Sequence, residues 1–542
     1  MSTIAAILDP ETGSYRWSDT KAWQVVAEVP LVETFVPLLK ARPDRAFITF
    51  EDGTVVTNAE VLERAEKVAG WAMATVPTSD PIAMAIGNRA EFFIAWLALL
   101  STGHAMVSMN PAGRTSEVVH MLRDSGARVA ISDSSSDPVL RAALADCPDL
   151  ELVHLVDGPE PDGLAGLYSG HSPRDLLTAP PPLSTVTSIT YTSGTTGIPK
   201  GCAHVQGELV RYADVNVRVY DFSEDDKILN PLLFFYGDAI WMMTVSIVTG
   251  ASFVSMRKFS VSRFWDVVRN NGVTVLVGIG AIPNLLLKRQ PGPDERDHSV
   301  RLAIQIGIPP KQHAELIERF GFPWLEAYGL SETGPNILMP PGLGEAYVGS
   351  GALGLPVPEL RAVLLDPEGN TLEGAAIGEL AVDGPYMMAG YLNQPAETER
   401  ITHGDFYRTG DEIERDVHGV YYFRGRLKEI IRRAGENIAP FEVEEILRLH
   451  PGVQDVAVVP VEDELRGEEV KAYVLPTSDD IDIAELIAFT HERLAPHKVP
   501  RYVELRTEPF PRTPSQRILK AALKVDGRHT TESSWDRTKE TA

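Results

Sequence analysis

Cysteine is scarce in this sequence. Among the 542 residues only Cys147 and Cys202 are cysteines. Two cysteines cannot build a disulfide framework, and they lack the ligand spacing of a zinc site. This composition suits a reducing compartment, so we expect a cytoplasmic protein. We expect Cys202 to be a small buried side chain rather than a nucleophile.

Long apolar runs and an excess of positive charge are also lacking. The longest apolar run, Phe92 to Leu100, is far too short to cross a bilayer. The first residues, Met1 to Asp9, have neither the basic region nor the apolar stretch of a signal peptide. The formal net charge of −25 argues against nucleic acid and anionic membranes as partners. The sequence therefore predicts no membrane span and no nucleic-acid partner.

The length and the patterning indicate a multidomain α/β protein. A chain of 542 residues is too long for one compact core, so we expect at least two domains. Between residues 31 and 150, helical patterns such as 58–73 alternate with short apolar strands such as 81–86. This alternation predicts layered sheets with parallel strands, covered by helices.

The segment from Tyr191 to Gly201, YTSGTTGIPKG, has the composition of a phosphate site. Glycines let backbone N–H groups approach a ligand closely, while the hydroxyls and Lys200 supply further donors. The segment is not a Walker A loop, because Pro199 stands where that motif requires glycine. The alternative interpretation is an ordinary surface loop rich in Ser, Thr and Gly.

Two later segments carry further chemistry. In the segment from Glu326 to Gly334, a predicted strand leads into a loop that contains glycine and Glu332. A carboxylate such as that of Glu332 can hold a magnesium ion that offsets the charge of bound phosphates. The segment from Phe423 to Ile438 is strongly basic, and on charge alone it would be a solvated linker.

Together these three segments resemble the motifs of the adenylate-forming superfamily, which includes the acyl-CoA synthetases. The order of segments from Pro231 to Gly334 is similar to that of the carnitine/crotonobetaine-CoA ligase branch. The resemblance implies a large N-terminal α/β domain over residues 1–427, with a β-rich subdomain over about 355–427. It also implies a small mobile α+β domain over 428–526, followed by a polar, loosely held tail over 527–542.

The resemblance also implies roles for individual residues. Tyr328 would stack on adenine, Thr333 would contact the α-phosphate and Asp411 would bind the ribose. The whole implied nucleotide site comprises Thr192, Ser193, Gly194, Thr195, Thr196, Gly197, Lys200, Gly307, Glu326, Ala327, Tyr328, Gly329, Ser331, Thr333, Asp411, Tyr422 and Arg426. Magnesium would be held by Glu332 and Thr192, the hinge would be Lys428, and coenzyme A would meet Gly435 and Glu436.

The acid site is implied by the segment from Pro231 to Gly237. The family usually has Pro-Leu-Phe-His-x-x-Gly there, and this chain has Phe234 at the histidine position. An aromatic cluster can equally be a core, so both interpretations stay open. The implied acid-binding residues are Phe234, Phe235, Tyr236, Trp241, Gly278 and Gly280.

One departure from the family concerns catalysis. Where the family has Ser/Thr-Gly-Lys near the C-terminus, this chain has Gln516 and Arg517. Arginine keeps the charge but is longer and forked. Arg517 does the work of the lysine, or Lys520 replaces it, or the acid is unusual; we favour Arg517. The implied catalytic set is then Lys200, Glu332, Thr333 and Arg517.

The sequence thus predicts an ATP-dependent acid–CoA ligase that uses magnesium, forms an acyl-adenylate from a small-molecule acid and releases AMP. One alternative is an adenylating enzyme with a different acceptor, or one that activates nitrite to diazotise an arylamine. Another is a nucleotide-binding protein that has lost catalysis. The oligomeric state is open, with a homodimer among the options.

Overall fold

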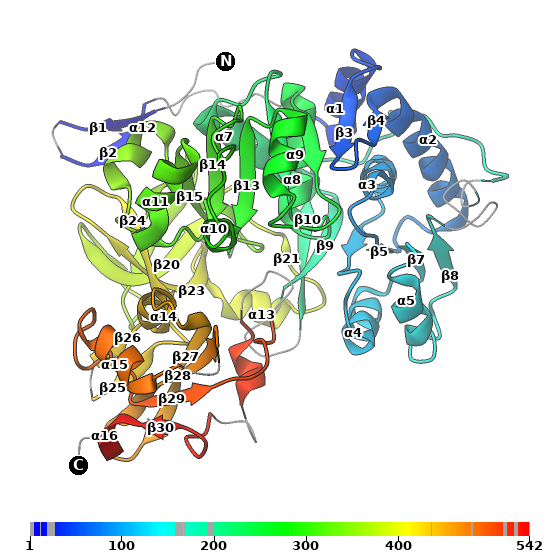
Figure 1. Ribbon diagram of the computed structural model, residues 1–542. Coiled ribbons are helices and arrows are strands. Elements are labelled where there is room, and N and C mark those ends of the chain that lie inside the picture. The colour runs from blue at the N-terminus through cyan, green and yellow to red at the C-terminus, as the bar shows by residue number, and fades with distance from the viewer. Residues whose placement is uncertain are drawn as a thin grey trace. The chain divides into compact units, whose positions relative to one another are not determined.

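The protein is described by a computed structural model that covers residues 5–10, 12–18, 28–157, 166, 169–192, 199–280, 282–434, 436–478, 481–512, 518–524 and 529–540. The chain divides into two compact units (Figure 1). The first unit comprises Met1–Ala362 and Val382–Tyr407, and the second comprises Val363–Ala381 and Arg408–Ala542.

The first unit contains a sheet with the strand order β21-β10-β9-β6-β5-β7-β8. Strands β5 to β9 pair in parallel, whereas β10 and β21 join in antiparallel fashion. The strands are β5 (Ile82–Ala85), β6 (Met106–Ser108), β7 (Val129–Ser132), β8 (Leu152–Leu155), β9 (Val186–Thr192), β10 (Lys200–Val205) and β21 (Gly390–Tyr391).

A second sheet of this unit runs in the order β17-β16-β15-β14-β13-β11-β12-β3-β4. Its central strands, from β15 to β3, are parallel. The strands are β3 (Ala46–Phe50), β4 (Val55–Thr57), β11 (Lys227–Asn230), β12 (Ser252–Ser255), β13 (Val275–Ile279), β14 (Leu302–Ile306), β15 (Trp324–Leu330), β16 (Gly334–Leu338) and β17 (Ala352–Pro356). A separate hairpin joins β1 (Ala6–Leu8) and β2 (Tyr15–Trp17).

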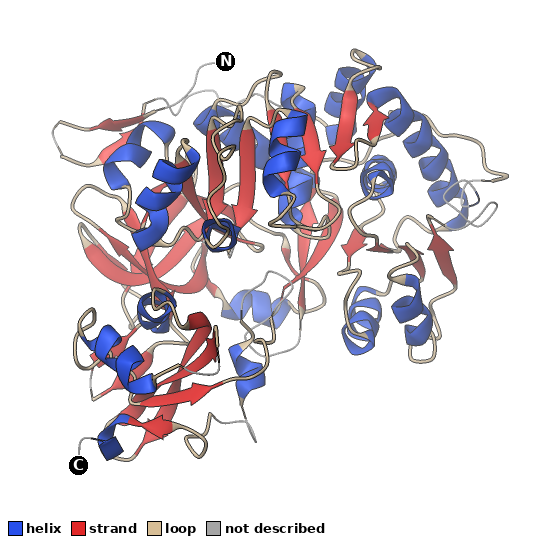
Figure 2. Cartoon of the chain, in the orientation of Figure 1, coloured by secondary structure: helices blue, strands red, loops and turns tan. Residues whose placement is uncertain are grey.

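Helices cover both sheets (Figure 2). They are α1 (Leu31–Lys40), α2 (Asn58–Thr75), α3 (Ala90–Thr102), α4 (Thr115–Ser125), α5 (Asp137–Ala143), α7 (Gln206–Tyr220), α8 (Gly237–Thr249), α9 (Phe264–Asn271), α10 (Ile282–Leu287), α11 (Pro310–Phe320), α12 (Pro341–Gly344) and α13 (Pro395–Arg400). Figure 1 shows α2 and α3 on one face of the first sheet and α4 and α5 on the other. Helix α7 contacts the first sheet, α8 contacts the second, and the two pack on each other, so helices separate the sheets.

Local sequence explains where the helices begin and how deeply they lie. Helix α2 starts with a capping box, in which Thr57 accepts from the Glu60 N–H and the Glu60 carboxylate accepts from the Thr57 N–H. Helix α3 is buried along nearly its whole length, as its all-round apolar sequence requires. It ends at Gly103, whose φ of 81° favours glycine.

Large side chains fill the core of the second sheet. Phe264 and Trp265 of α9 and Phe320 of α11 pack with Trp324 of β15.

The second unit combines a β-rich part and an α+β part. The β-rich strands, some of which begin or end in the first unit, are β18 (Arg361–Leu365), β19 (Thr371–Leu372), β20 (Ala376–Asp383), β23 (Phe406–Arg415) and β24 (Tyr421–Arg426). Strand β22 (Thr402–His403), which pairs with β23, belongs to the first unit. The remaining sheet has the order β26-β25-β28-β29-β30, and β27 also pairs with β28. Its elements are β25 (Ile431–Arg433), β26 (Glu436–Ile438), α14 (Pro440–Arg448), β27 (Val453–Asp463), β28 (Gly467–Pro476), α15 (Ile483–His491), β29 (Tyr502–Leu505), β30 (Trp535–Asp536) and α16 (Arg537–Glu540).

The tail corrects one expectation. We predicted a loosely held segment after residue 526, but β30 pairs with β29 in antiparallel fashion. Trp535 packs against the core of the second unit, and Asp536 pairs with Arg501 at 3.3 Å. Residues 529–540 are therefore part of the fold.

The predicted fold class is confirmed: a large N-terminal α/β part is followed by a small C-terminal α+β part. In the sequence, the last segment of the first unit ends at Tyr407 and the second unit resumes at Arg408, whereas we placed the domain boundary after residue 427. Contacts alone do not locate a hinge, so Lys428 stays a prediction. Within the described residues, no helix is both long and apolar enough to traverse a bilayer.

Candidate active site

The predicted phosphate segment begins and ends on one hairpin. Strands β9 and β10 pair so that Thr192 lies opposite Lys200. The end of the segment is anchored where His120 Nε2 lies 2.8 Å from the carbonyl oxygen of Pro199. The other predicted phosphate contacts lie outside the described residues: Ser193, Gly194, Thr195, Thr196 and Gly197.

Lys200 is buried beside two side chains of a distant segment. Its Nζ forms an ion pair with Glu397 of α13 and lies 5.1 Å from the ring centroid of Tyr391. Arg400 donates to the same carboxylate at 2.9 and 3.0 Å. The Arg400 and Lys200 cations together lower the pKa of Glu397 to about 2, so Glu397 is ionised at neutral pH.

Glu332 approaches the same tyrosine from the loop after β15. Tyr391 Oη donates a hydrogen bond of 2.9 Å to Glu332 Oε1, and the Tyr407 hydroxyl lies 3.4 Å from Tyr391 Oη. Burial and the Glu332 charge raise the pKa of Tyr391. The structure thus brings Lys200 and Glu332, both predicted catalytic residues, to opposite parts of one side chain.

Cys202 lies two residues after Lys200 on β10 and is fully buried. Burial, with the nearby Glu332 charge, raises the pKa of the Cys202 thiol well above its usual value. A buried protonated thiol is a poor nucleophile, so the expected packing role is confirmed.

The loop after β14 is held by Glu326. Its two carboxylate oxygens accept hydrogen bonds of 2.7 Å from the N–H groups of Gly307 and Ile308. Gly307 has a φ of 87°, which favours glycine. Tyr328 and Ala327 follow on β15, and the side chain of Tyr328 is mostly buried.

The two hydroxyl residues beside Glu332 differ in accessibility. Thr333 is 0% exposed, and its Oγ1 accepts a hydrogen bond of 2.7 Å from Asn336 Nδ2. Ser331 is partly exposed. A contact between Thr333 and the α-phosphate stays a prediction, but in this geometry Ser331 is the more accessible hydroxyl. Gly329 is required by packing, since a Cβ there would lie 2.3 Å from the carbonyl oxygen of Gly334.

Phe234, at the position of the family histidine, lies in an aromatic cluster. It is 0% exposed, and its ring centroid lies 5.7, 4.7 and 6.2 Å from those of Phe92, Phe93 and Phe253. This is the core packing that we left open for the segment. Phe234 as an acid-contacting residue therefore stays a prediction without support from its surroundings.

The neighbouring aromatic residues are less enclosed. Tyr236 and Trp241 are partly exposed, and Trp241 stacks on Tyr212 with ring centroids 4.7 Å apart. The rings of Phe235 and Tyr236 lie 4.1 Å apart. These residues keep their predicted role as candidates for the acid site.

Asn88, a residue that our sequence analysis missed, holds this segment in place. Its Oδ1 accepts a hydrogen bond of 2.9 Å from the Phe234 N–H. Its Nδ2 donates to the carbonyl oxygens of Leu232 at 2.9 Å and Met256 at 2.7 Å. One buried amide therefore fixes the aromatic segment at two backbone positions.

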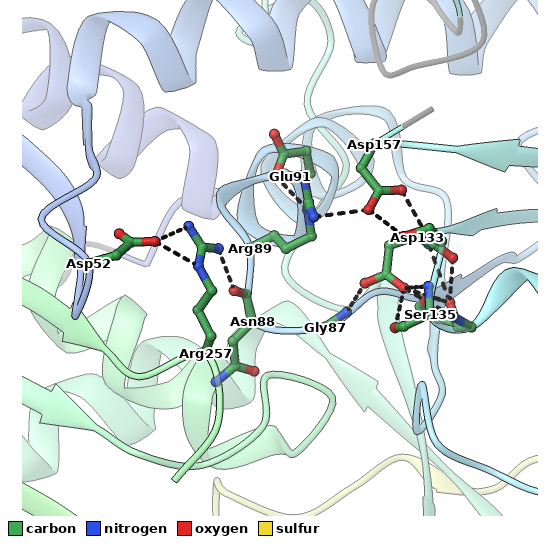
Figure 3. A network of polar contacts seen from close by, with 12 residues as sticks. Asp52, Gly87, Asn88, Arg89, Glu91, Asp133, Ser135, Asp157 and Arg257 are labelled. Carbon is green, nitrogen blue, oxygen red and sulfur yellow. Dashed lines mark hydrogen bonds and ion pairs between the residues drawn. The ribbon is translucent and has the colours of Figure 1, made fainter. Parts of the chain in front are cut away.

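Figure 3 shows the polar network around Asn88. Arg257 donates to the backbone oxygen of Asn88 and pairs with Asp52 at 3.0 Å. Arg89, the next residue in the chain, pairs with Asp157 at 3.0 Å. The Gly87 N–H donates to Asp133 at 2.8 Å. These contacts rigidify the loop after β5.

The two predicted glycines of the acid site differ in what surrounds them. A Cβ on Gly278 would lie 2.4 Å from Gln305 Oε1, whereas a Cβ on Gly280 would meet nothing within 4 Å. Gly278 and Gln305 border a small hollow, whose other lining is mostly apolar. The small residue at 278 is thus explained by the neighbouring amide.

The predicted ribose residues lie in the second unit. Asp411 is 2% exposed, and its Oδ1 lies 3.3 Å from Arg426 Nε. Glu379 orients the preceding turn by accepting from the N–H of Gly410 at 3.1 Å. Tyr422 donates to Asp416 at 3.0 Å. Ribose binding by Asp411, Arg426 and Tyr422 stays a prediction.

The predicted C-terminal residues are only partly described. Gly435 and Arg517 lie outside the described residues, while Glu436 is exposed at the start of β26. Lys520 Nζ lies 2.8 Å from Glu429 and 2.9 Å from Glu444. This amine already neutralises two carboxylates, which disfavours Lys520 as the substitute for the family lysine.

The fold, together with Lys200 and Glu332 on either part of Tyr391, defines the class of protein to which the chain belongs. Residues 38–392 match the family described as AMP-binding enzyme, and residues 442–517 match the AMP-binding enzyme C-terminal domain. The chain is therefore a member of the AMP-binding enzyme family. The predicted membership in the adenylate-forming superfamily is confirmed.

Individual relatives extend this result. The chain is 29% identical over 511 residues to a sulfoacetate–CoA ligase of Cupriavidus necator, covering 92% of this chain and 98% of the relative. It is 29% identical over 483 residues to a crotonobetaine/carnitine–CoA ligase of Citrobacter koseri, covering 86% and 92%.

Solved structures share the architecture. The o-succinylbenzoate CoA synthetase of Bacillus subtilis, solved with its acyl-adenylate intermediate, is 26% identical with a TM-score of 0.80, covering 91% of this chain and 98% of that chain. MatB of Rhodopseudomonas palustris, solved with ATP bound, is 26% identical with a TM-score of 0.79, covering 90% and 97%.

Proposed function

We propose that this protein is an ATP-dependent acid–CoA ligase of the AMP-forming type. The observation that carries the proposal is the convergence of Lys200 and Glu332 on Tyr391 within the fold of the AMP-binding family. The relatives named above, acid–CoA ligases and synthetases, support the same reaction type.

In the proposed first half-reaction, a carboxylate oxygen of the acid attacks the α-phosphorus of ATP. The bond to the bridging oxygen breaks, and pyrophosphate leaves with the electron pair. Lys200 is suited to hold the leaving phosphates, because its ammonium is positioned in advance by a buried strand. Catalysis then rests on positioning and charge neutralisation.

Magnesium fits the residues present. Glu332 offers a partly exposed carboxylate that Tyr391 orients, and Thr192 offers a hydroxyl opposite Lys200. The described part of the chain contains no group of three or more His, Cys, Asp or Glu side chains that could hold a metal. A single carboxylate suits an ion that is held largely by substrate phosphates. The bound ion would neutralise charge on the phosphate oxygens.

In the proposed second half-reaction, the thiolate of coenzyme A attacks the acyl carbon and AMP leaves. The assignments of Glu436 and Gly435 to coenzyme A, Lys428 to the hinge and Arg517 to the acid carboxylate remain proposals. Arg517 is the last residue of the segment that matches the AMP-binding enzyme C-terminal domain, and the other three assignments rest on the motif from Phe423 to Ile438.

We further propose a small-molecule acid as the substrate and the cytoplasm as the location. Phe235, Tyr236 and Trp241 are our candidates for the apolar side chains that such an acid would contact, because Phe235 packs on Tyr236 and Trp241 stacks on Tyr212. A homodimer remains a prediction.

The test is pyrophosphate release from MgATP with a library of carboxylates, with and without coenzyme A. A ligase releases pyrophosphate and AMP with at least one acid and forms its CoA thioester. Pyrophosphate release that responds to an amine or a carrier protein, but not to coenzyme A, would favour the alternative acceptor. ATP binding without turnover on any acid would favour a protein that has lost catalysis.

A further inference from the structure

Helix α13 supplies a counter-charge for the lysine that the proposed function assigns to phosphate. Lys200 is 8% exposed, and its ammonium pairs with Glu397. Burying an ammonium without a partner is costly, so this carboxylate stabilises the empty site. Tyr391, from the strand just before α13, adds a ring face to the same ammonium.

Glu397 does not depend on Lys200 alone. Arg400, one helical turn further on, donates to it through Nε at 2.9 Å and Nη2 at 3.0 Å. When Lys200 turns to another anion, Glu397 therefore keeps a cationic partner. When Lys200 leaves Glu397 for another anion, neither side chain is left as an unpaired charge. An unpaired buried charge is the main cost of breaking an ion pair, so this cost is avoided.

We propose that Glu397 competes with polyphosphate for Lys200, occupying the ammonium when the site is empty and yielding it when a polyphosphate binds. The ligand class is a chain of phosphates, as in ATP or the pyrophosphate product. The inference rests on the proposed function, because that function assigns Lys200 to phosphate. As a consequence, Glu397 weakens the binding of pyrophosphate to Lys200 and speeds the release of this product.

The experiment measures the affinity of inorganic tripolyphosphate by titration calorimetry for the wild type and for Glu397→Gln. Glutamine keeps the size of the side chain and removes its charge. We expect about three- to tenfold tighter binding, in keeping with a partly exposed ion pair. Unchanged or weaker binding would overturn the inference. Glu397→Ala provides a second variant with the same expected direction if the glutamine variant folds poorly.

A matched control exists on the same helix. Glu399 is exposed, and Glu399→Gln changes the net charge by the same amount. We expect it to stay within about twofold of the wild type, since Glu399 is exposed and charges in contact with solvent are screened by salt. A gain equal to that of Glu397→Gln would show a general charge effect and contradict the proposal.

The double variant Glu397→Gln with Lys200→Gln tests whether Glu397 changes the tripolyphosphate affinity through Lys200. If Glu397 acts by competing for Lys200, its replacement brings no gain once Lys200 is gone. A gain that persists would overturn the competition.

Failure of the inference can be told apart from failure of the proposed function. If pyrophosphate release depends on an acid but wild type and Glu397→Gln bind tripolyphosphate equally, the ligase function is supported and the competition between Glu397 and polyphosphate is refuted. If Glu397→Gln binds tripolyphosphate more tightly than wild type but no acid is turned over, the competition is supported and the ligase function is refuted. If neither the wild type nor the glutamine variant binds tripolyphosphate, the competition is refuted.

Discussion

The hydroxyl group of Tyr391 donates a hydrogen bond of 2.9 Å to Glu332 across 59 residues of sequence. The same ring lies 5.1 Å from the ammonium of Lys200. A tyrosine on a two-residue strand thus joins the two groups on which the proposed reaction depends.

The first prediction concerns this hydrogen bond. Tyr391→Phe removes the donor that orients Glu332 and leaves the ring beside Lys200. We expect the magnesium concentration for half-maximal activity to rise by about tenfold, as is usual when a partner of a metal-binding group is lost. Nucleotide binding in the absence of magnesium, measured by calorimetry, should stay the same. Tyr407→Phe is the control, because it removes only the hydroxyl 3.4 Å from Tyr391 Oη and leaves the hydrogen bond from Tyr391 to Glu332 in place. Equal magnesium dependence in Tyr391→Phe and wild type would contradict the role.

The second prediction concerns the clamp on the aromatic segment. Asn88→Asp keeps the acceptor for the Phe234 N–H but loses the hydrogen bonds to the carbonyl oxygens of Leu232 and Met256, which are worth about 0.5–1.5 kcal/mol each. We expect the KM for the acid to rise at least fivefold while the KM for ATP changes less than twofold. Steady-state kinetics on an acid from the screen measure both. Asp52→Asn is the control, because it breaks the nearby pair with Arg257 without touching the segment. Equal increases in both constants would instead indicate general loss of structure.

The third prediction concerns pH. Although part of the Asp238 side chain reaches the surface, loss of solvation in the first turn of α8 raises its pKa to about 6. The unfolded value is about 3.9, so between pH 4 and 6 the folded protein binds more protons than the unfolded chain. Stability should therefore fall as pH rises through this window.

Asp238→Asn removes that titration. We expect the variant to melt at a higher temperature than the wild type at pH 7.5, with a gain of at most about 3 kcal/mol, and to match it near pH 4. Melting curves at several pH values measure the difference. The exposed Asp225→Asn should show no such trend. A difference that is constant with pH would refute the raised pKa.

The fourth prediction concerns the tail. Trp535 packs against the core of the second unit, so Trp535→Ala should lower the free energy of unfolding by about 2–3 kcal/mol, a little less than for a fully buried aromatic residue. Urea unfolding followed by circular dichroism measures the effect. Leu465, which is 94% exposed, supplies the control in Leu465→Ala. No difference between the two variants would mean that the tail adds no stability.

Much of this architecture could be predicted because its signals are local. Alternating apolar patterns predicted β5 and α2 to within a few residues, and the predicted phosphate segment runs from the end of β9 to the start of β10. Strands of four to seven residues and helices of ten or more carry enough periodicity to be recognised.

Tyr391, Glu397 and Asn88 could not be found in this way. Their roles depend on contacts across 59, 197 and 146 residues of chain, and no periodic pattern records such contacts.

The order of the tail was mispredicted, whereas the role of Phe234 was left open, and the two have different reasons. Strand β30 has only two residues, too few for any periodicity, and is ordered by pairing with β29. For Phe234 the sequence allowed a core or a pocket wall, and only the positions of Phe92, Phe93 and Phe253 distinguish the two.

The central claim is that a carboxylate oxygen attacks the α-phosphorus of ATP. The most direct measurement uses an acid from the screen labelled with ¹⁸O in its carboxylate, followed by mass spectrometry of the nucleotide product after thioester formation. Attack at the α-phosphorus places one ¹⁸O atom in AMP, because the acyl–oxygen bond breaks when the thiolate displaces AMP. Label in inorganic phosphate, with ADP as the nucleotide product, would contradict the account.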